Sequence, residues 1–243
     1  MSELSPSSAA LWQGPLGWLG ISLICGSCLF FFYQRTPLRY RPILCNARWI
    51  VIPYLGLLTG GISPRLMGLT GINWFASFGF GLVLIGGVLV VLIIVRSVTA
   101  FPVANAPVAH APAEAAGSQN YLTPRTAAAL PVSLVAIGAE EFHWAFLRSA
   151  LWEIFLAFPL LAPQAGYWAA WMAVLLALPE ALRYQTSFSQ RICKCALLVT
   201  TTVLFLFTRN LWLSWLLHVL GWTLLAPASK DEKSPSSTHT RRT

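Results

Sequence analysis

Residues 139–148 read Ala-Glu-Glu-Phe-His-Trp-Ala-Phe-Leu-Arg and lie inside an apolar run from Pro131 to Phe158. Four ionisable side chains therefore fall where a helix of this hydropathy would cross a membrane. A charged side chain at the centre of a bilayer costs ~2.5 to 3.5 kcal/mol on insertion scales. Two adjacent carboxylates, Glu140 and Glu141, consequently need partners or a chemical task, and the rest of the chain must supply them.

The composition indicates a membrane protein. Hydrophobic residues make up 56% of the 243 positions and charged residues only 10%, a balance that a water-soluble domain of this size does not need. The formal net charge of +8 does not indicate nucleic-acid binding, because the basic residues lie in short clusters between apolar runs. We predict an all-α, polytopic protein whose first partner is the lipid bilayer.

Seven apolar runs predict about seven transmembrane helices, because ~20 residues of helix span the hydrocarbon core. The runs cover residues 15–33, 49–63, 73–95, 131–158, 167–182, 192–208 and 210–226. The second and fifth are short, since Pro64 and Arg65 end one early and Pro179 interrupts the other. Both are expected to be tilted, kinked or only partly spanning.

The basic residues between the runs predict the orientation of the chain. With the N-terminus outside, Arg65 and Arg209 fall on the outer side and Arg148 stays in the membrane. The inner side receives the other thirteen of the 16 basic residues, namely Arg35, Arg39, Arg41, Arg48, Arg96, Arg125, Arg183, Arg191, Lys194, Lys230, Lys233, Arg241 and Arg242. This asymmetry predicts an external N-terminus and a cytoplasmic C-terminus in the cell membrane.

Changes of composition divide the chain into four parts. Residues 1–97 are predicted to form an N-terminal three-helix membrane region, and residues 127–226 a four-helix core. Residues 98–126 between them are rich in Pro and Ala and are predicted to be a flexible cytoplasmic linker. The polar residues 227–243 are predicted to be a disordered cytoplasmic tail.

Half of the eight acidic residues fall within predicted spans, namely Glu140, Glu141, Glu153 and Glu180. On a helix, Glu140 is the neighbour of His143 and Trp144, while Glu141 shares its face with Trp144 and Arg148. Carboxylate, imidazole and guanidinium groups therefore lie on one broad stripe. This stripe is either a functional site or a buried polar cluster that satisfies itself and holds helices together.

A second polar position lies in the last run, where His218 shares a helical face with Trp215 and Trp222 and is predicted to point into the bundle. Glu180 either joins this group or extends to cytoplasmic water beside Arg183. We expect five side chains from three helices to converge on one cavity that opens toward the cytoplasm: Glu140, Glu141, His143, Glu180 and His218.

The C-terminal half, about residues 127–226, resembles the CPBP family, the CAAX proteases and bacteriocin-processing proteins, which are intramembrane metalloproteases. That family carries Glu-Glu-x-x-x-Arg in one membrane helix, Phe-x-x-x-His in the next and His-x-x-x-Asn in the last of four core helices. Glu140 and Glu141 match the paired glutamates, and His218 looks like the histidine of the last motif. Three motif positions differ, with Ala145 for the arginine, Glu180 near the place of the second-motif histidine and Trp222 for the asparagine.

The resemblance implies an intramembrane peptidase that acts on a membrane-embedded or lipidated protein, with Glu140 and Glu141 as catalytic residues. It also implies a divalent metal such as zinc, which would activate a water molecule. The candidate ligands are His218, Glu140, His143 and Glu180.

The three changed motif positions support a second hypothesis, a catalytically inactive member of the family. Such a protein would serve as a membrane scaffold or accessory subunit that binds a partner membrane protein. An ion or proton pathway built on the carboxylates is a third hypothesis, which the absence of transporter-like repeats in the sequence disfavours.

Overall fold

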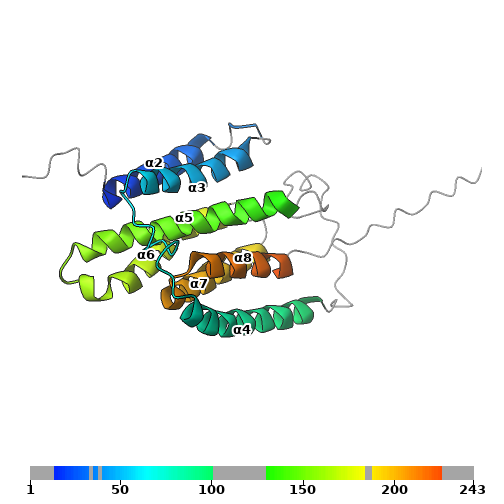
Figure 1. The fold of residues 1–243 in the computed structure, drawn as a ribbon. Helices are drawn as coiled ribbons and strands as arrows, with labels where there is room; N and C mark the ends of the chain where they lie inside the picture. The colour runs from blue at the N-terminus through cyan, green and yellow to red at the C-terminus, as the bar shows by residue number, and fades with distance from the viewer. Residues whose placement is uncertain (1–13, 33–34, 38–39, 101–129, 184–187, 226–243) are drawn as a thin grey trace, which may run out of the picture.

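The computed structural model describes residues 14–32, 35–37, 40–100, 130–183 and 188–225. Within these ranges the chain is all-α, with seven α-helices and one short 3₁₀ turn (Figure 1). The elements are α2 (Pro15–Phe32), α3 (Arg41–Leu58), α4 (Trp74–Ala100), α5 (Leu130–Leu156), η3 (Ala162–Gln164), α6 (Ala165–Arg183), α7 (Phe188–Thr208) and α8 (Leu211–Leu225). Residues 101–126 of the predicted linker and the predicted tail at 227–243 lie outside the described residues.

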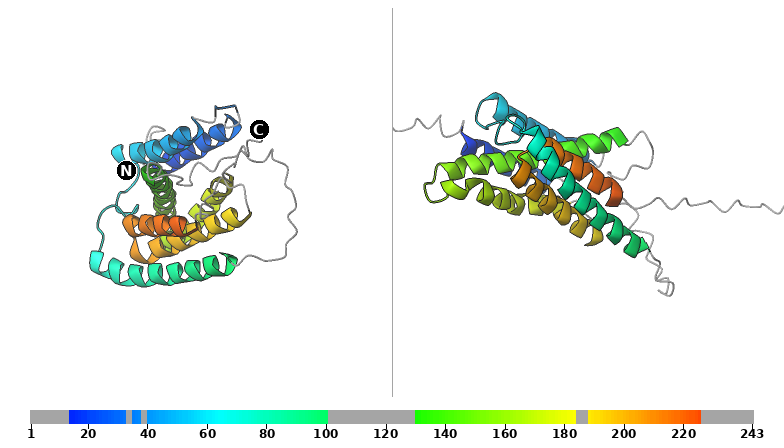
Figure 2. Two further views of the ribbon diagram at one scale, coloured as in Figure 1. Left: turned by 90° about the vertical axis from the view of Figure 1, so that its right-hand side faces the viewer. Right: turned by 60° about the horizontal axis from the view of Figure 1, so that its bottom comes forward.

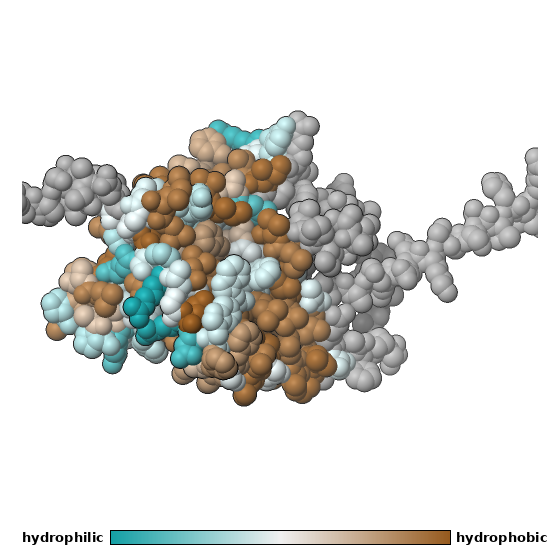
Figure 3. Space-filling view, viewed as in Figure 1, coloured by the Kyte–Doolittle hydropathy of each residue, from teal (hydrophilic) through white to brown (hydrophobic). Residues whose placement is uncertain are grey.

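Several of these helices suit a membrane. Four helical segments are long and apolar enough to cross one: Pro15–Phe32, Trp74–Ile94, Ala162–Leu182 and Arg191–Thr208. Two further apolar segments, Ile43–Leu58 and Leu211–Leu224, are shorter. Apolar side chains cover much of the molecular face in Figure 3, as expected for a surface in contact with lipid tails. The chain is an integral, multi-pass membrane protein.

The helices are arranged around a central group of four. Within it, α5 packs on α6, α6 on α7, and α7 on α8, and α8 returns to α5. The hairpin of α2 and α3 packs against α5, whereas α4 packs against α7 and α8 on the far side (Figures 1 and 2). The three N-terminal helices are therefore divided between two sides of the central group and do not form one packed region.

The two helices with an internal proline, α3 and α6, begin and end at other residues than predicted. The second span, predicted at 49–63, is wrong at both ends, because α3 begins at Arg41 with a proline in its first turn and ends at Leu58. Hydropathy placed it too late, since Arg41 and Arg48 lower the apolar content of the first half of the helix. In contrast, α6 continues through Pro179 to Arg183, so this proline does not end the helix.

Small residues line the most extensive helix contact among the described residues, which is between α5 and α6. One face of α6 carries a buried alanine at every fourth position, namely Ala169, Ala173, Ala177 and Ala181. Residues four apart lie on the same side of a helix, so this face is smooth and lets α5 approach closely. Large side chains of α5, among them Phe146 and Leu147, fill the core beside it.

The loop at residues 59–73 fixes the start of α8. Its Ile62 and Met67 are buried, and Gly68 has a φ of 74°. A Cβ atom at Gly68 would lie only 2.8 Å from the carbonyl oxygen of Arg209, so a larger residue does not fit. The backbone N–H of Leu211 donates to the carbonyl of Gly68 at 3.1 Å, which anchors the helix that carries His218.

Candidate functional site

Five buried polar side chains connect α5, α7 and α8, and we call them the closed cluster. Its members are Glu140, Glu141, Arg148, Lys194 and His218, none of which is more than 5% exposed. The prediction that His218 faces the paired glutamates across the bundle is confirmed.

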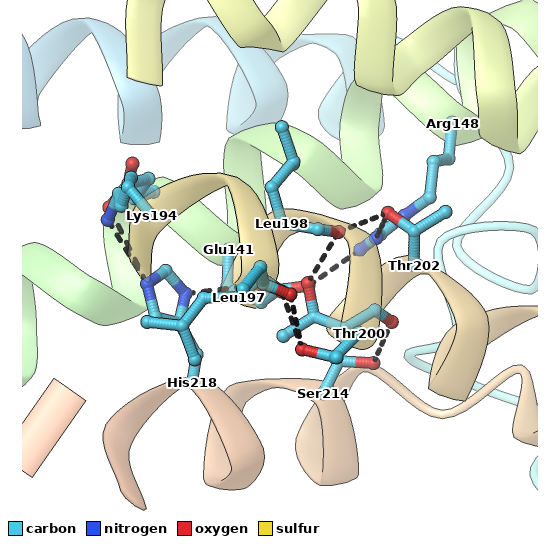
Figure 4. A network of polar contacts seen from close by, with 12 residues as sticks. Glu141, Arg148, Lys194, Leu197, Leu198, Thr200, Thr202, Ser214 and His218 are labelled. Atoms are coloured by element: carbon cyan, nitrogen blue, oxygen red, sulfur yellow. Dashed lines mark hydrogen bonds and ion pairs between the residues drawn. The ribbon is translucent and has the colours of Figure 1, made fainter. Parts of the chain in front are cut away.

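His218 lies between a cation and a carboxylate (Figure 4). The Nζ atom of Lys194 donates to Oε2 of Glu140 at 2.5 Å and lies 3.2 Å from Nε2 of His218. The other ring nitrogen, Nδ1, lies 3.3 Å from Oε2 of Glu141. An ammonium group has only donors, so Nε2 accepts and we assign the ring proton to Nδ1, which donates to Glu141. A neutral His218 thus satisfies both neighbours.

Arg148 completes the charge balance. Its NH2 group forms an ion pair with Oε1 of Glu141 at 2.7 Å, and its NH1 group lies 3.4 Å from Oγ1 of Thr202. The guanidinium carbon also lies 4.4 Å from the ring centroid of Phe205. With two carboxylates, two cations and a neutral histidine, the closed cluster has no net charge, which limits the cost of burying it.

Two indole rings enclose the cluster. The ring of Trp144 stacks on His218 with centroids 4.9 Å apart and an interplanar angle of 10°. The ammonium of Lys194 lies 5.4 Å from the Trp144 ring centroid and 5.1 Å from that of Trp222, distances at which cation–π attraction operates. Trp222, which stands where the CPBP family has asparagine, therefore contributes to holding the lysine.

The cluster bridges a gap between helices. No Cα atom of α5 lies within 8 Å of one in α7 in the described residues, although both helices pack on α6 and α8. Long side chains cross this space: Lys194 reaches Glu140 from α7, and Arg148 reaches Thr202 from α5. These side-chain contacts therefore connect α5 to α7, whereas the other neighbouring helices of the central group pack directly on each other.

A second polar group, which we call the open cluster, lies among α3, α5 and α6 and consists of Arg48, Trp49, His143 and Glu180. Trp49 Nε1 donates to Oε1 of Glu180 at 2.6 Å, and Arg48 forms an ion pair with the same oxygen. Nε2 of His143 lies 3.5 Å from Oε2 of Glu180. The Glu180 side chain is 23% exposed, unlike any member of the closed cluster.

The predicted convergence of five residues on one cavity is therefore wrong. Glu140, Glu141 and His218 come together, but His143 and Glu180 belong to the open cluster. Residues three apart on a helix project about 60° apart, and this angle directs Glu140 toward α7 and His143 toward α6. Glu180 does not join His218, because Arg48 and Trp49 hold it in the open cluster, where its side chain remains 23% exposed.

The predicted metal ligands are separated in the same way. Of the four candidates, Glu140 and His218 share the closed cluster, while His143 and Glu180 lie in the open one. No group of three or more His, Cys, Asp or Glu side chains in the described ranges is arranged to hold a metal ion. The ammonium of Lys194 lies within hydrogen-bond distance of both Glu140 and His218, so this arrangement does not fit a metal between them.

Sequence reasoning missed one basic member of each cluster, Lys194 of the closed cluster and Arg48 of the open one. Lys194 and Arg48 were counted as cytoplasmic residues that set orientation, yet they are 2% and 8% exposed. A signal existed for Lys194, which is the third residue of the apolar run 192–208 and so lies inside a predicted span. Arg48 and Trp49 are more than 130 residues away from Glu180 in the sequence. No local pattern therefore predicts that they contact it.

We compared the chain with models of protein families, with curated proteins and with solved structures, and no match was found in any of the three comparisons. The likeness to the CPBP family therefore rests on the motif residues quoted above, chiefly Glu140, Glu141 and His218.

Proposed function

We propose that this protein is a non-hydrolytic membrane scaffold or accessory subunit, a CPBP-like chain that binds a partner membrane protein. One observation carries the proposal: the ammonium of Lys194 lies 2.5 Å from Glu140 and 3.2 Å from His218. A lysine in this position gives the cluster a stabilising role that requires neither a metal nor a substrate.

The environment of the glutamates supports this role. Oε1 of Glu141 contacts Arg148 and Oε2 contacts His218, and the residue is 0% exposed. A general base must come within hydrogen-bond reach of the proton that it removes. Glu141 already has partners on both oxygens, so water activation would require the cluster to come apart.

The proposal is tested by the metal content of the full-length protein purified after expression in zinc-containing medium. We expect clearly less than one zinc or other transition metal per chain, in the wild type and in Glu140→Gln alike. One metal per chain in the wild type that is lost in Glu140→Gln would overturn the proposal in favour of a metalloprotease.

The second candidate function is the intramembrane peptidase acting on a membrane-embedded or lipidated protein. The observation that favours it is the approach of His218 Nδ1 to Glu141 Oε2 at 3.3 Å, because the CPBP resemblance assigns both residues to the site. In this case Glu141→Gln should abolish cleavage of a co-expressed lipidated substrate without lowering expression, since it keeps the shape and removes the base. Equal processing by wild type and variant would rule this candidate out.

We further propose that all seven helices cross the cell membrane, with the N-terminus outside and the C-terminus in the cytoplasm. The support is the distribution of basic residues. When the buried Arg48 and Lys194 are removed from the thirteen inner residues, eleven still oppose the two outer ones. A reporter fused to the C-terminus should therefore read cytoplasmic and one fused before Leu11 external, and the reverse would contradict this orientation.

A further inference from the structure

Two exposed arginines lie at the end of the bundle where α5 and α7 finish and α6 and α8 begin (Figure 1). Arg65 belongs to the loop at residues 59–73, along which Figure 3 shows hydrophilic side chains, and Arg209 joins α7 to α8. Gly68 connects them, since its N–H donates to the carbonyl of Arg65 at 3.1 Å and its carbonyl accepts from Leu211 at 3.1 Å. The fold therefore brings two positive charges to one place.

Neither arginine has a carboxylate partner among the described residues, whereas Arg48, Arg148 and Lys194 each form an ion pair with a glutamate. The one acidic residue that the described chain places at this end is Glu153, and its Oε1 atom accepts the backbone N–H of Ser63 at 2.5 Å. Two cations thus face one carboxylate that is already engaged. This end of the bundle carries an excess of positive charge.

The guanidinium of Arg209 is held in a fixed position. Its central carbon lies 4.7 Å from the ring centroid of Trp152, a distance at which cation–π attraction operates. The same indole packs tightly on Gly166, where a Cβ atom would lie only 2.6 Å from Cζ2 of the ring. A guanidinium stacked on an aromatic ring keeps the N–H groups of its edge available, and this planar fork matches a phosphate group.

The backbone of Arg209 is unusual as well. Its φ of 48° is the one positive φ of a non-glycine residue in the described part of the chain. Glycine adopts this conformation freely, whereas other L residues are strained in it. Strain of this kind is often kept where the side chain has a task. A binding role of the guanidinium accounts for arginine at a position that suits glycine better.

Exposed aromatic side chains surround this end of the bundle. They lie in the first turns of α4, α6 and α8 and are 45% to 51% exposed, namely Trp74, Tyr167, Trp168 and Trp212. Tryptophan and tyrosine gather where a membrane meets water, at the level of the lipid head groups. Arg209 is three residues from Trp212 and therefore lies at the depth of lipid phosphates.

From these observations we infer that Arg209, stacked on Trp152, binds the phosphate of an anionic phospholipid and that Arg65 adds a second positive charge. The edge of the Arg209 guanidinium donates to two phosphate oxygens. A lipid with a net negative charge is favoured, because phosphatidylcholine carries a cation of its own that compensates its phosphate. The orientation proposed above places this lipid in the outer leaflet.

This inference does not rest on the proposed function, since a scaffold and a peptidase can both carry such a site. The test uses full-length protein in phosphatidylcholine nanodiscs and a phosphatidylglycerol probe with a photoreactive diazirine beside its head group. Labelling of peptides from residues 59–73 and 206–213 should saturate, and unlabelled phosphatidylglycerol should compete for it. Inorganic phosphate should not compete. Competition by phosphate alone would show a site for free anions and would overturn the assignment to a lipid.

Three variants separate this site from general attraction between charges. Arg209→Gln should weaken saturable labelling of these peptides about tenfold or more, because charge-assisted hydrogen bonds are lost. Arg65→Gln should weaken it about threefold, since an exposed charge contributes less. Arg35→Gln makes the same change of charge at an exposed residue between α2 and α3, and should leave this labelling unchanged.

Arg209→Gly tests whether the arginine is merely structural. Glycine relieves the backbone strain, so this variant should unfold at a temperature no lower than Arg209→Gln while losing the label to the same extent. Labelling that does not saturate, that falls equally in Arg35→Gln and Arg209→Gln, or that persists in Arg209→Gly would overturn the inference. The competition between phosphatidylglycerol and phosphate uses the wild-type protein and decides the matter even where a variant does not fold.

Discussion

The closed and open clusters both take side chains from one stretch of α5, yet they differ in how far their charged groups are buried and paired. In the closed cluster every charge has a buried partner of opposite sign, and His218 uses both ring nitrogens. In the open cluster Glu180 is 23% exposed and Nδ1 of His143 has no hydrogen-bond partner among the described residues. The first arrangement is suited to holding helices together, and the second leaves the carboxylate of Glu180 partly exposed.

The difference shows that motif residues alone do not define a site. Glu140 and Glu141 match the CPBP pattern, but the surroundings convert them into ion-pair partners. His143 and Glu180, which do not match that pattern, lie beside a cavity among α2, α3, α5 and α6. The sequence of α5 concentrates polar residues, and the neighbouring helices determine what each residue does.

The largest effect is expected from Lys194→Met, which removes the cation between Glu140 and His218. The free energy of unfolding should fall by ~3 to 5 kcal/mol, because a buried carboxylate is left without its partner. Thermal or SDS-induced unfolding of the full-length protein in detergent measures this loss. Arg191→Met, which changes an exposed residue on the same helix, is the matched control and should change stability little.

A smaller loss is expected from Arg148→Met, about 3 kcal/mol, since His218 still donates to Glu141. Arg148→Lys should restore only part of it, because one ammonium cannot reproduce the separate NH1 and NH2 contacts to Thr202 and Glu141. The same unfolding assay applies. Full recovery with lysine would show that only the charge matters at this position.

The open cluster should be less sensitive. Glu180→Gln is expected to cost only ~1 to 2 kcal/mol, since water can reach the site and the amide oxygen still accepts from Trp49. A loss as large as that of Lys194→Met would contradict the distinction between the two clusters.

The smallest effect concerns the loop that anchors α8. Oε1 of Glu153 accepts the backbone N–H of Ser63 at 2.5 Å, so Glu153→Ala should cost ~0.5 to 1.5 kcal/mol. Glu153→Gln keeps an acceptor and should cost less. Limited proteolysis at residues 59–73 should be faster in the alanine variant, and equal rates in both variants would show that this contact does not hold the loop.

Much of the fold was predictable because hydrophobic runs and helices coincide. The fourth run, 131–158, matches α5 at Leu130–Leu156, and the last run, 210–226, matches α8 at Leu211–Leu225. The face of α5 that carries Glu141, Trp144 and Arg148 also follows from helical periodicity alone. These features depend on residues near one another in the chain, and local sequence therefore determines them.

The pairing of charges was not predictable in the same way. Lys194 and Arg48 lie near the ends of apolar runs, where positive charge ordinarily marks the cytoplasmic boundary. Whether such a residue faces water or a buried carboxylate depends on how α3 and α7 sit against the other helices. Lys194 is the buried partner of Glu140, and Arg48 is that of Glu180. Only the tertiary structure shows these two pairs.

The central claim is that the closed cluster is a charge-compensated structural element, and a double-mutant cycle between Glu140 and Lys194 tests it most directly. Lys194→Met and Glu140→Gln, alone and together, are compared with the wild type by the free energy of unfolding of the full-length protein. We expect the double variant to be at least ~2 kcal/mol more stable than the sum of the single losses predicts, since it leaves no uncompensated charge. Additive losses would show that the lysine and the glutamate do not depend on each other, and would contradict the account.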